Sequence, residues 1–459
     1  MTTLKKRSLQ AVLIALVTMV CLPAAMAGIA IEHWTQPSGA QVFLVQSHAI
    51  QMLDVQLDFD AGSRRDPPGQ AGLASVTASL SGMGVRANPV RGEVALDENA
   101  LGEAWADLGA RFGAHASSDR MSFALRSLTY PDLLAKVVQL AARQLAEPAF
   151  PAEIWQRERE TMIAAIKEAD TRPATLAQRA FDQAVYGSHP YGYDTNAASL
   201  QRIEVSHMAA LYRQLIQPCR AKVMVVGAVT RAQTDALVTQ LLARLPGPGD
   251  AAASACPALP AVAEVQPLTQ ASEQRIAFES AQAHVLLGQP GYKRNDPDFF
   301  AMLVGNYILG DGGFVSRLTH EVREKRGLSY SVYSYFAPGL HAGAFTIGLQ
   351  TRPDQADQAL QLSREVLARF VADGPTEAEL QAAKNNLIGG FALRLDSNRK
   401  LLDNVANIAW NNLPLDYLDT WTQRVQSITA ADIRAAFQRK LQPDRMVTVV
   451  LGGIQQAPQ

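Results

Sequence analysis

Residues 203–227, IEVSHMAALYRQLIQPCRAKVMVVG, are repeated in outline by residues 428–452, ITAADIRAAFQRKLQPDRMVTVVLG. Both segments start with Ile, continue with a helical pattern, reach Gln-Pro at the same spacing and end in a β-branched run closed by Gly. This shared pattern predicts a helix followed by a buried strand in each segment. We therefore expect the chain to contain one αβ unit twice.

Further paired elements extend this duplication over nearly all of both halves. Strands are predicted at residues 53–59 and 283–289, long helices at 131–146 and 354–372, and following helices at 153–184 and 377–393. Residues 246–270 are rich in Pro, Ala, Gly and Ser and lack periodicity, which is typical of a linker. The linker separates an N-terminal domain, residues 28–245, from a C-terminal domain, residues 271–459.

Clustered strands interrupted by pairs of helices favour an α+β fold. The expected architecture is two homologous α/β sandwich halves, each a mixed or antiparallel sheet flanked by helices. The linker joins the halves, which are expected to face a central cavity.

The N-terminus has the three parts of a secretory signal peptide. KKR at residues 5–7 precedes an apolar run over residues 9–22, and AMA at residues 25–27 is a small-residue cleavage site. Residues 1–27 are therefore predicted to be a signal peptide, and the mature chain to be exported to the periplasm as a soluble protein. No later segment has the roughly 20 apolar residues of a membrane span, and no membrane or lipid anchor is expected.

The composition argues against nucleic acid as a partner. The chain has 42 Lys and Arg against 43 Asp and Glu, so it lacks the basic excess of nucleic-acid-binding proteins. Cys219 and Cys256 remain after the signal peptide is lost. An oxidising compartment permits a disulfide between them, but the sequence leaves their pairing open.

Residues 61–80, AGSRRDPPGQAGLASVTASL, contain a second helix pattern that starts after Gly72. One apolar face at helical spacing is predicted for Leu73, Val76, Leu80 and Met83. Another face is predicted to hold Ser75, Ala78 and Ser79 together. Positions i and i+4 of such a helix are where two His ligands of one zinc ion would lie.

The lead-in AGSRRD and Gly72-Leu73-Ala74 resemble the pitrilysin/insulysin-type (insulinase-like, inverzincin) metallopeptidases, where such a lead-in runs into H-x-x-E-H. In this resemblance Ser75 and Ser79 stand where the family has its two His, and Ala78 stands where it has the Glu of that motif. Ala165 stands where the family has its third zinc ligand, a Glu on a later helix. Catalytic zinc needs about three protein ligands and a carboxylate base, which Ser and Ala do not supply. The resemblance therefore implies a degenerate zinc motif, with no metal cofactor and no catalytic residue in this chain.

Residues 309–335, LGDGGFVSRLTHEVREKRGLSYSVYSY, resemble the second half of the same peptidases. The pattern predicts a Gly-rich turn, then an amphipathic helix, then a break at Arg326-Gly327 and finally a strand. The apolar face of the helix is expected to carry Phe314, Val315, Leu318 and Val322. In the family, an Arg and a Tyr seven residues apart reach the peptide at the zinc, and Arg323 and Tyr330 have this spacing. The resemblance implies that both bind substrate, because a guanidinium and a phenol can donate hydrogen bonds to peptide carbonyls. Tyr333, Tyr335 and Phe336 are expected to pack in the sheet.

Family members of this short, two-domain length commonly work as pairs, and some pairs combine a chain that has H-x-x-E-H with one that lacks it. The resemblance therefore implies a non-catalytic, substrate-positioning subunit of an exported heterodimeric zinc metallopeptidase. Its zinc would lie in a homologous partner subunit, and its substrate would be a peptide or unfolded polypeptide. The alternative is a structural or peptide-binding module of peptidase fold that has no role in proteolysis.

Overall fold

The computed structural model describes residues 28–247 and 256–453. The predicted signal peptide, residues 1–27, lies outside the described residues, as do residues 248–255 of the linker and residues 454–459. None of the helices among the described residues is long and apolar enough to cross a bilayer.

The first half contains the strands β1 (Glu32–Thr35), β2 (Gln41–Gln46), β3 (Met52–Phe59), β4 (Arg111–Ala116), β5 (Met121–Leu128) and β6 (Lys222–Gly227). Its helices are α2 (Leu73–Leu80), α3 (Glu98–Asp107), α4 (Pro131–Ala146), α5 (Ala152–Ala169), α6 (Pro173–Tyr186), α7 (Ala197–Gln201), α8 (Val205–Leu215) and α9 (Arg231–Leu242). The second half contains the strands β7 (Ser272–Ile276), β8 (Ala283–Pro290), β9 (Ser331–Phe336), β10 (Ala344–Thr351) and β11 (Val447–Leu451). Its helices are α10 (Phe299–Asn306), α11 (Ala356–Asp373), α12 (Glu377–Gly389), α13 (Asn398–Trp410), α14 (Tyr417–Ser427) and α15 (Ala430–Lys440).

The two sheets have matching topologies. Their strand orders are β1-β2-β6-β3-β5-β4 and β7-β11-β8-β10-β9. Within each sheet one pair is parallel, β2 with β6 and β7 with β11, and the other pairs are antiparallel. The repeated sequence unit forms α8–β6 in one half and α15–β11 in the other, so the predicted duplication and α+β fold are confirmed.

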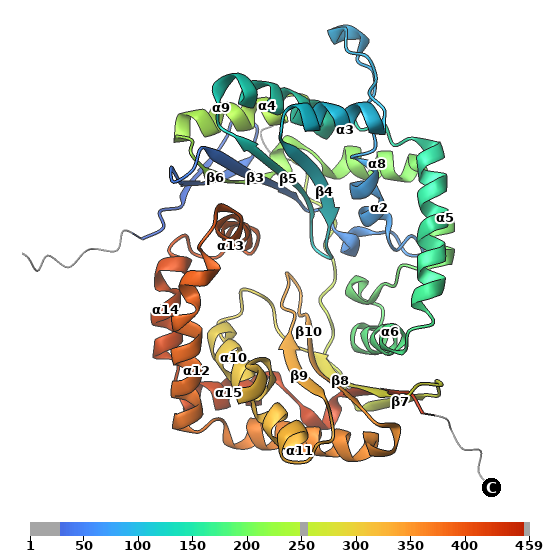
Figure 1. The fold of residues 1–459 in the computed structure, drawn as a ribbon, viewed down its shortest axis with the longest axis vertical. Helices are drawn as coiled ribbons and strands as arrows, with labels where there is room; N and C mark the ends of the chain where they lie inside the picture. Colours follow the sequence, from blue (N-terminus) through green and yellow to red (C-terminus); the bar gives the residue numbers. More distant parts are fainter. Residues whose placement is uncertain (1–27, 248–255, 454–459) are drawn as a thin grey trace, which may run out of the picture.

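The single helix predicted over residues 153–184 is wrong, because the chain breaks between α5 and α6. Pro173 is the first residue of α6, and Arg172 before it is extended. Proline has no N–H for an intrahelical bond and disfavours helical geometry in the residue before it. The break lets α6 leave the first half and reach the second sheet (Figure 1).

Each half covers part of the other half's sheet with a helix. Phe181 of α6 is fully buried in an apolar cluster with Leu286 of β8 and Val449 of β11. In return, α13 lies on β3 and β6 of the first sheet (Figure 1). Lys222 of β6 binds the last turn of α13, where its Nζ donates to the Ala409 carbonyl at 2.7 Å. A cation at a helix C-terminus stabilises the helix because it lies at the negative end of the helix dipole. The two halves are therefore joined by these helix–sheet contacts as well as by the linker.

The linker is fastened to the first half. Cys219 and Cys256 form a disulfide, which resolves the pairing that the sequence left open. Beyond it, Arg65 Nη1 donates to the Pro260 carbonyl at 2.9 Å, and Val265 is buried. The linker thus follows the surface of the first half before it enters the second sheet.

Candidate functional site

The first candidate region is α2 and the turn before it. Gly72 begins the helix with φ of 101°, a left-handed conformation that favours glycine. The Asp66 carboxylate accepts hydrogen bonds from the backbone N–H groups of Gly72, at 2.8 Å, and Ala74, at 2.9 Å. These bonds satisfy two donors at the helix start. Burial raises the pKa of Asp66 to about 7, against the pull of those N–H groups.

The zinc-motif positions on α2 divide between surface and core. Ser75 and Ser79, one turn apart, are exposed, whereas Ala78 is only 1% exposed and packs in the core. Helical spacing keeps Ala78 on the side of α2 that bears the two serines, but that side is covered at Ala78 and open at the serines. Leu73, Val76 and Leu80 are buried as predicted, and Ala78 belongs to the same core cluster.

These positions offer no metal ligands. Ala165, the position expected to correspond to the third ligand, is exposed on α5. Methyl groups have no lone pair, and neutral serine hydroxyls are not among the usual zinc ligands. Across residues 28–247 and 256–453 there is no group of three His, Cys, Asp or Glu side chains that could hold a metal ion.

The second candidate region surrounds Arg323 and Tyr330. Arg323 lies on the π-helical turn Thr319–Glu324, and Gly327, with φ of 61°, ends it. Tyr330 directly precedes β9 and is 80% exposed. The predicted apolar face is only half correct, because Leu318 and Val322 are buried while Phe314 and Val315 are 66% and 71% exposed.

Phe314 instead contacts Arg323. Its ring lies in the 3-10 turn Gly313–Val315, and its centroid is 4.8 Å from Arg323 Cζ. The Tyr330 ring centroid is 4.9 Å from the same atom. Both distances suit cation–π contacts. The guanidinium thus lies against two exposed rings, and no hydrogen bond or ion pair within the described parts of the chain uses its N–H groups.

The sequence pattern does not reveal this clamp of Phe314 and Tyr330 on Arg323, because it predicts Phe314 on the apolar face of a helix. The signal that could have found it is the Gly312-Gly313 pair, which interrupts the helix before Phe314. At Gly313, φ is 61°, and the ring that follows turns outward. The arrangement can present hydrogen-bond donors in a fixed position to an acceptor outside this chain.

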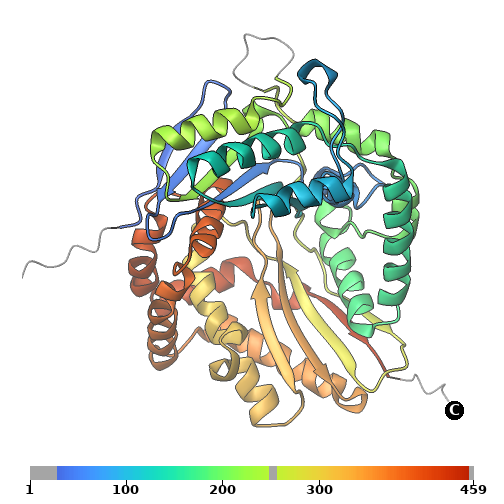
Figure 2. The same ribbon diagram turned by 45° about the horizontal axis from the view of Figure 1, so that its top comes forward.

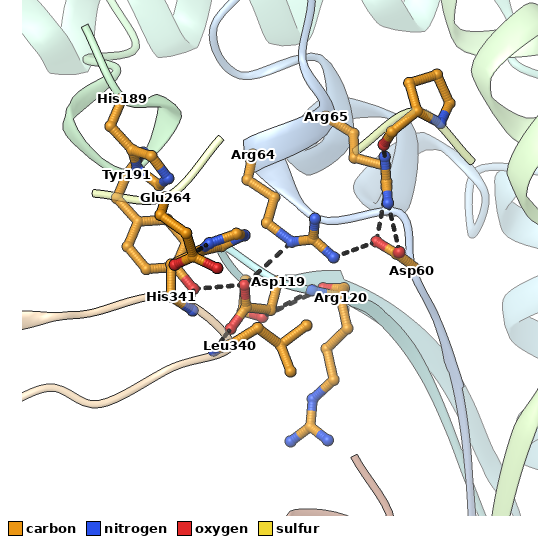
Figure 3. A network of polar contacts seen from close by, with 12 residues as sticks. Asp60, Arg64, Arg65, Asp119, Arg120, His189, Tyr191, Glu264, Leu340 and His341 are labelled. Carbon is orange, nitrogen blue, oxygen red and sulfur yellow. Dashed lines mark hydrogen bonds and ion pairs between the residues drawn. The ribbon is translucent and has the colours of Figure 1, made fainter. Parts of the chain in front are cut away.

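A polar network joins both halves and the linker near the loop between β9 and β10 (Figure 3). Tyr191 Oη donates to Asp119 Oδ1 at 2.6 Å, and the second carboxylate oxygen accepts from the Leu340 N–H at 3.0 Å. His341 Nδ1 lies 3.1 Å from Glu264 Oε2 of the linker. Figure 2 shows this loop reaching the layer of the first half. The network thus ties the loop between β9 and β10 to the first half and to the linker.

The chain has clear relatives among known proteins. Residues 41–198 match the family described as Insulinase (Peptidase family M16), and residues 202–387 match the Peptidase M16 inactive domain. The crystal structure of a peptidase M16 inactive domain from Pseudomonas fluorescens is 33% identical, with a TM-score of 0.85 over 93% of this chain and 100% of that chain. A Streptomyces coelicolor protein named an uncharacterized zinc protease is 26% identical over 88% of this chain and 86% of its own length. A Helicobacter pylori protein named non-peptidase homolog YmxG is 25% identical over 85% of this chain and 87% of its own length.

Proposed function

The chain belongs to the insulinase family of peptidases, M16, and from that premise we propose that it is the non-catalytic subunit of a heterodimeric zinc peptidase. The observation that supports this proposal combines the two candidate regions, α2 and the surroundings of Arg323. The zinc-motif positions hold Ser and Ala, whereas Arg323 is held against Phe314 and Tyr330 with its donors free of partners among the described residues. The chain supplies substrate-positioning donors, and a homologous partner supplies zinc.

The proposed role of Arg323 and Tyr330 is to donate hydrogen bonds to the peptide at the partner's zinc. Donors aimed at a carbonyl oxygen stabilise the negative charge that develops as the peptide bond is attacked. The planar guanidinium of Arg323 offers several donors in a fixed arrangement. Neither group needs a metal of its own.

Export to the periplasm belongs to the same proposal. The signal-peptide pattern at residues 1–27 supports it, as does the disulfide between Cys219 and Cys256, because disulfides persist in oxidising compartments. The peptide or unfolded polypeptide cleaved by the pair would then be an extracytoplasmic one.

The test mixes the purified chain with a homologous H-x-x-E-H subunit from the same genome and measures cleavage of internally quenched peptides. Arg323→Ala and Tyr330→Phe are each expected to lower kcat/KM by about 100- to 1,000-fold, the range for a lost oxyanion donor. The matched control is Arg326→Ala, because Arg326 is exposed nearby and is already bonded to Glu321.

Two outcomes would overturn the proposal. One is full activity of the zinc subunit without this chain. The other is equal activity of the Arg323→Ala and Arg326→Ala complexes, which would favour a structural or peptide-binding module with no role in proteolysis. Chelator-sensitive proteolysis by this chain alone would contradict the ligand argument made for α2.

A further inference from the structure

The loop between β9 and β10, residues 337–343, brings the second half into contact with the first half and the linker (Figure 3). β9 before it is held in the second sheet at its end, where Phe336 packs on Phe345 as predicted. Earlier in β9, Tyr333 is 42% exposed, so the prediction that it packs in the sheet is wrong in part. Beyond Phe336 the chain leaves the sheet and reaches across to the first half (Figure 2). The loop is thus one of the points at which the two halves are joined.

The backbone of this loop is bound by two side chains of the first half. The Leu340 N–H group donates to Asp119 Oδ2 at 3.0 Å, and the His341 N–H group donates to Tyr191 Oη at 3.2 Å. The fit is close, because a Cβ added at Gly339 would lie 2.6 Å from Tyr191 Oη and 2.8 Å from Asp119 Oδ2. The loop therefore stays in this place only while the Asp119 and Tyr191 side chains keep theirs.

Two buried histidines face each other at the same contact. His189 caps the 3-10 turn Pro190–Gly192 of the first half and is 6% exposed, while His341 of the loop is 7% exposed. Their ring centroids are 5.1 Å apart, and the Tyr191 ring centroid is 4.8 Å from that of His189. Histidine is the side chain whose ordinary pKa lies between pH 5 and pH 8. A modest change of pH can therefore alter the charge inside this contact.

The hydrogen bond made by His189 requires a neutral ring. Its Nδ1 accepts from the Tyr191 N–H group at 3.1 Å, so Nδ1 carries no proton. A neutral imidazole then has its single N–H on the other ring nitrogen, Nε2. A second proton would bind to Nδ1 and point at the Tyr191 N–H group, with two donors facing each other. Protonation of His189 is therefore incompatible with the turn that places Tyr191 under the loop.

The surroundings of His189 also favour its neutral form. The titratable groups that face it are Tyr186 of α6, Tyr191 of the following turn, Asp119 between β4 and β5, Glu264 of the linker and His341 of the loop. Both carboxylates already have a cation, since Asp119 Oδ1 lies 3.1 Å from Arg64 Nε and Glu264 Oε1 lies 2.6 Å from Lys293 Nζ. Burial, followed by the nearby His341, lowers the pKa of His189, against the weaker opposing pull of the Ala263 backbone and the two carboxylates.

We propose that His189 makes this contact sensitive to pH, so that protonation of its ring releases the loop at residues 337–343 from the first half and the linker. A proton that binds to the released state but not to the docked state favours release as the pH falls below 6.5, the ordinary pKa of histidine. Between pH 7.5 and pH 5.5 the released fraction should rise by up to about tenfold. This inference concerns the hold between the halves, and it goes beyond the proposed function.

The experiment is hydrogen–deuterium exchange of the full mature chain at pH 7.5 and pH 5.5, corrected for the intrinsic pH dependence of amide exchange. The amides of Leu340 and His341 report release directly, because their acceptors lie in the first half. Their protection should fall by up to about tenfold at pH 5.5. Amides of β5 should keep their protection, which distinguishes release of the loop from a general loss of stability.

Two variants assign the effect to His189. In His189→Asn the Asn side chain can accept the same N–H group at the start of the turn but does not titrate, so the loop should be equally protected at both pH values. The matched control is His320→Asn, because His320 is exposed and bonds Glu324 on the distant turn Thr319–Glu324. Its loop should respond to pH as in wild type.

Three results would overturn the inference. One is equal protection of the wild-type loop at both pH values, and another is a pH response that persists in His189→Asn. The third comes from NMR titration of the wild-type histidine rings, with the His189 signal assigned by its loss in the variant. A His189 ring that titrates at or above pH 6.5 would contradict the requirement for a neutral ring in the docked loop. This measurement decides the matter even if the loop of His189→Asn is already unprotected at pH 7.5.

Discussion

Replacing Phe181 by Ala is expected to uncouple the two halves of the chain. Phe181 lies on α6, which belongs to the first half in sequence, yet its ring is fully buried on the second sheet. The fit is close, since a Cβ added at Gly288 would lie 2.8 Å from Phe181 Cζ. Truncating a buried Phe to Ala costs about 3–5 kcal/mol in lost transfer energy and residual cavity. Here most of that cost falls on the contact between the halves.

Phe123→Ala is the matched control. Phe123 is equally buried, at 1% exposure, but it packs inside the first core against Phe59 and Tyr212. Its loss should cost a similar free energy without loosening α6. Hydrogen–deuterium exchange by mass spectrometry distinguishes the two variants, because local opening exposes amides in the element that has come loose.

In Phe181→Ala, amides of α6 and of β11 beneath it are expected to exchange faster, and calorimetry should separate the unfolding of the two halves. In Phe123→Ala, faster exchange should appear in β5 instead. Wild-type exchange in α6 and β11 of Phe181→Ala, accompanied by the same fall in Tm as in Phe123→Ala, would refute the coupling argument.

Three other changes test separate features. Cys219→Ser should lower the free energy of unfolding by about 3–4 kcal/mol in a denaturant titration, since the disulfide closes a loop with a sequence separation of 37, and the difference from wild type should vanish under reductant. Asp66→Asn tests the raised pKa of Asp66, because folded Asp66 keeps its proton up to about pH 7 while the unfolded chain releases it near the ordinary value of 3.8. Between pH 5 and pH 8 the free energy of unfolding of wild type should therefore fall by up to about 2 kcal/mol relative to that of the variant. Parallel curves of unfolding free energy against pH would contradict this. Combined Ser75→His, Ser79→His and Ala165→Glu should give a chain that copurifies with zinc by elemental analysis, more tightly than the version without Ala165→Glu; equal affinities would place Ala165 outside the metal site.

The absence of His and Glu at the predicted zinc-motif positions can be read from the sequence, because residue type alone decides it. Ser75 and Ala165 cannot act as His and Glu in any fold. The burial of Ala78 could not be read in the same way, since a methyl group fits both a surface and a core, and the neighbouring β-sheet decides between them. The position of the Phe314 ring could not be predicted from the sequence either. Its apolar character fits a buried helix face, but in the structure the ring is exposed and contacts Arg323.

Sequence by itself determined the duplicated αβ unit and the strands and helices that follow from it, because hydrophobic periodicity and turn residues are local properties of the chain. Only the tertiary structure decided that α6 and α13 each cover the other half's sheet, and that Gln178 of α6 lines one pocket with Tyr333 of β9. These contacts join residues more than a hundred positions apart, and they depend on the direction the chain takes after the break at Pro173. A local pattern contains no information about that direction, so the exchange of helices between the two halves emerges only when both sheets are packed together.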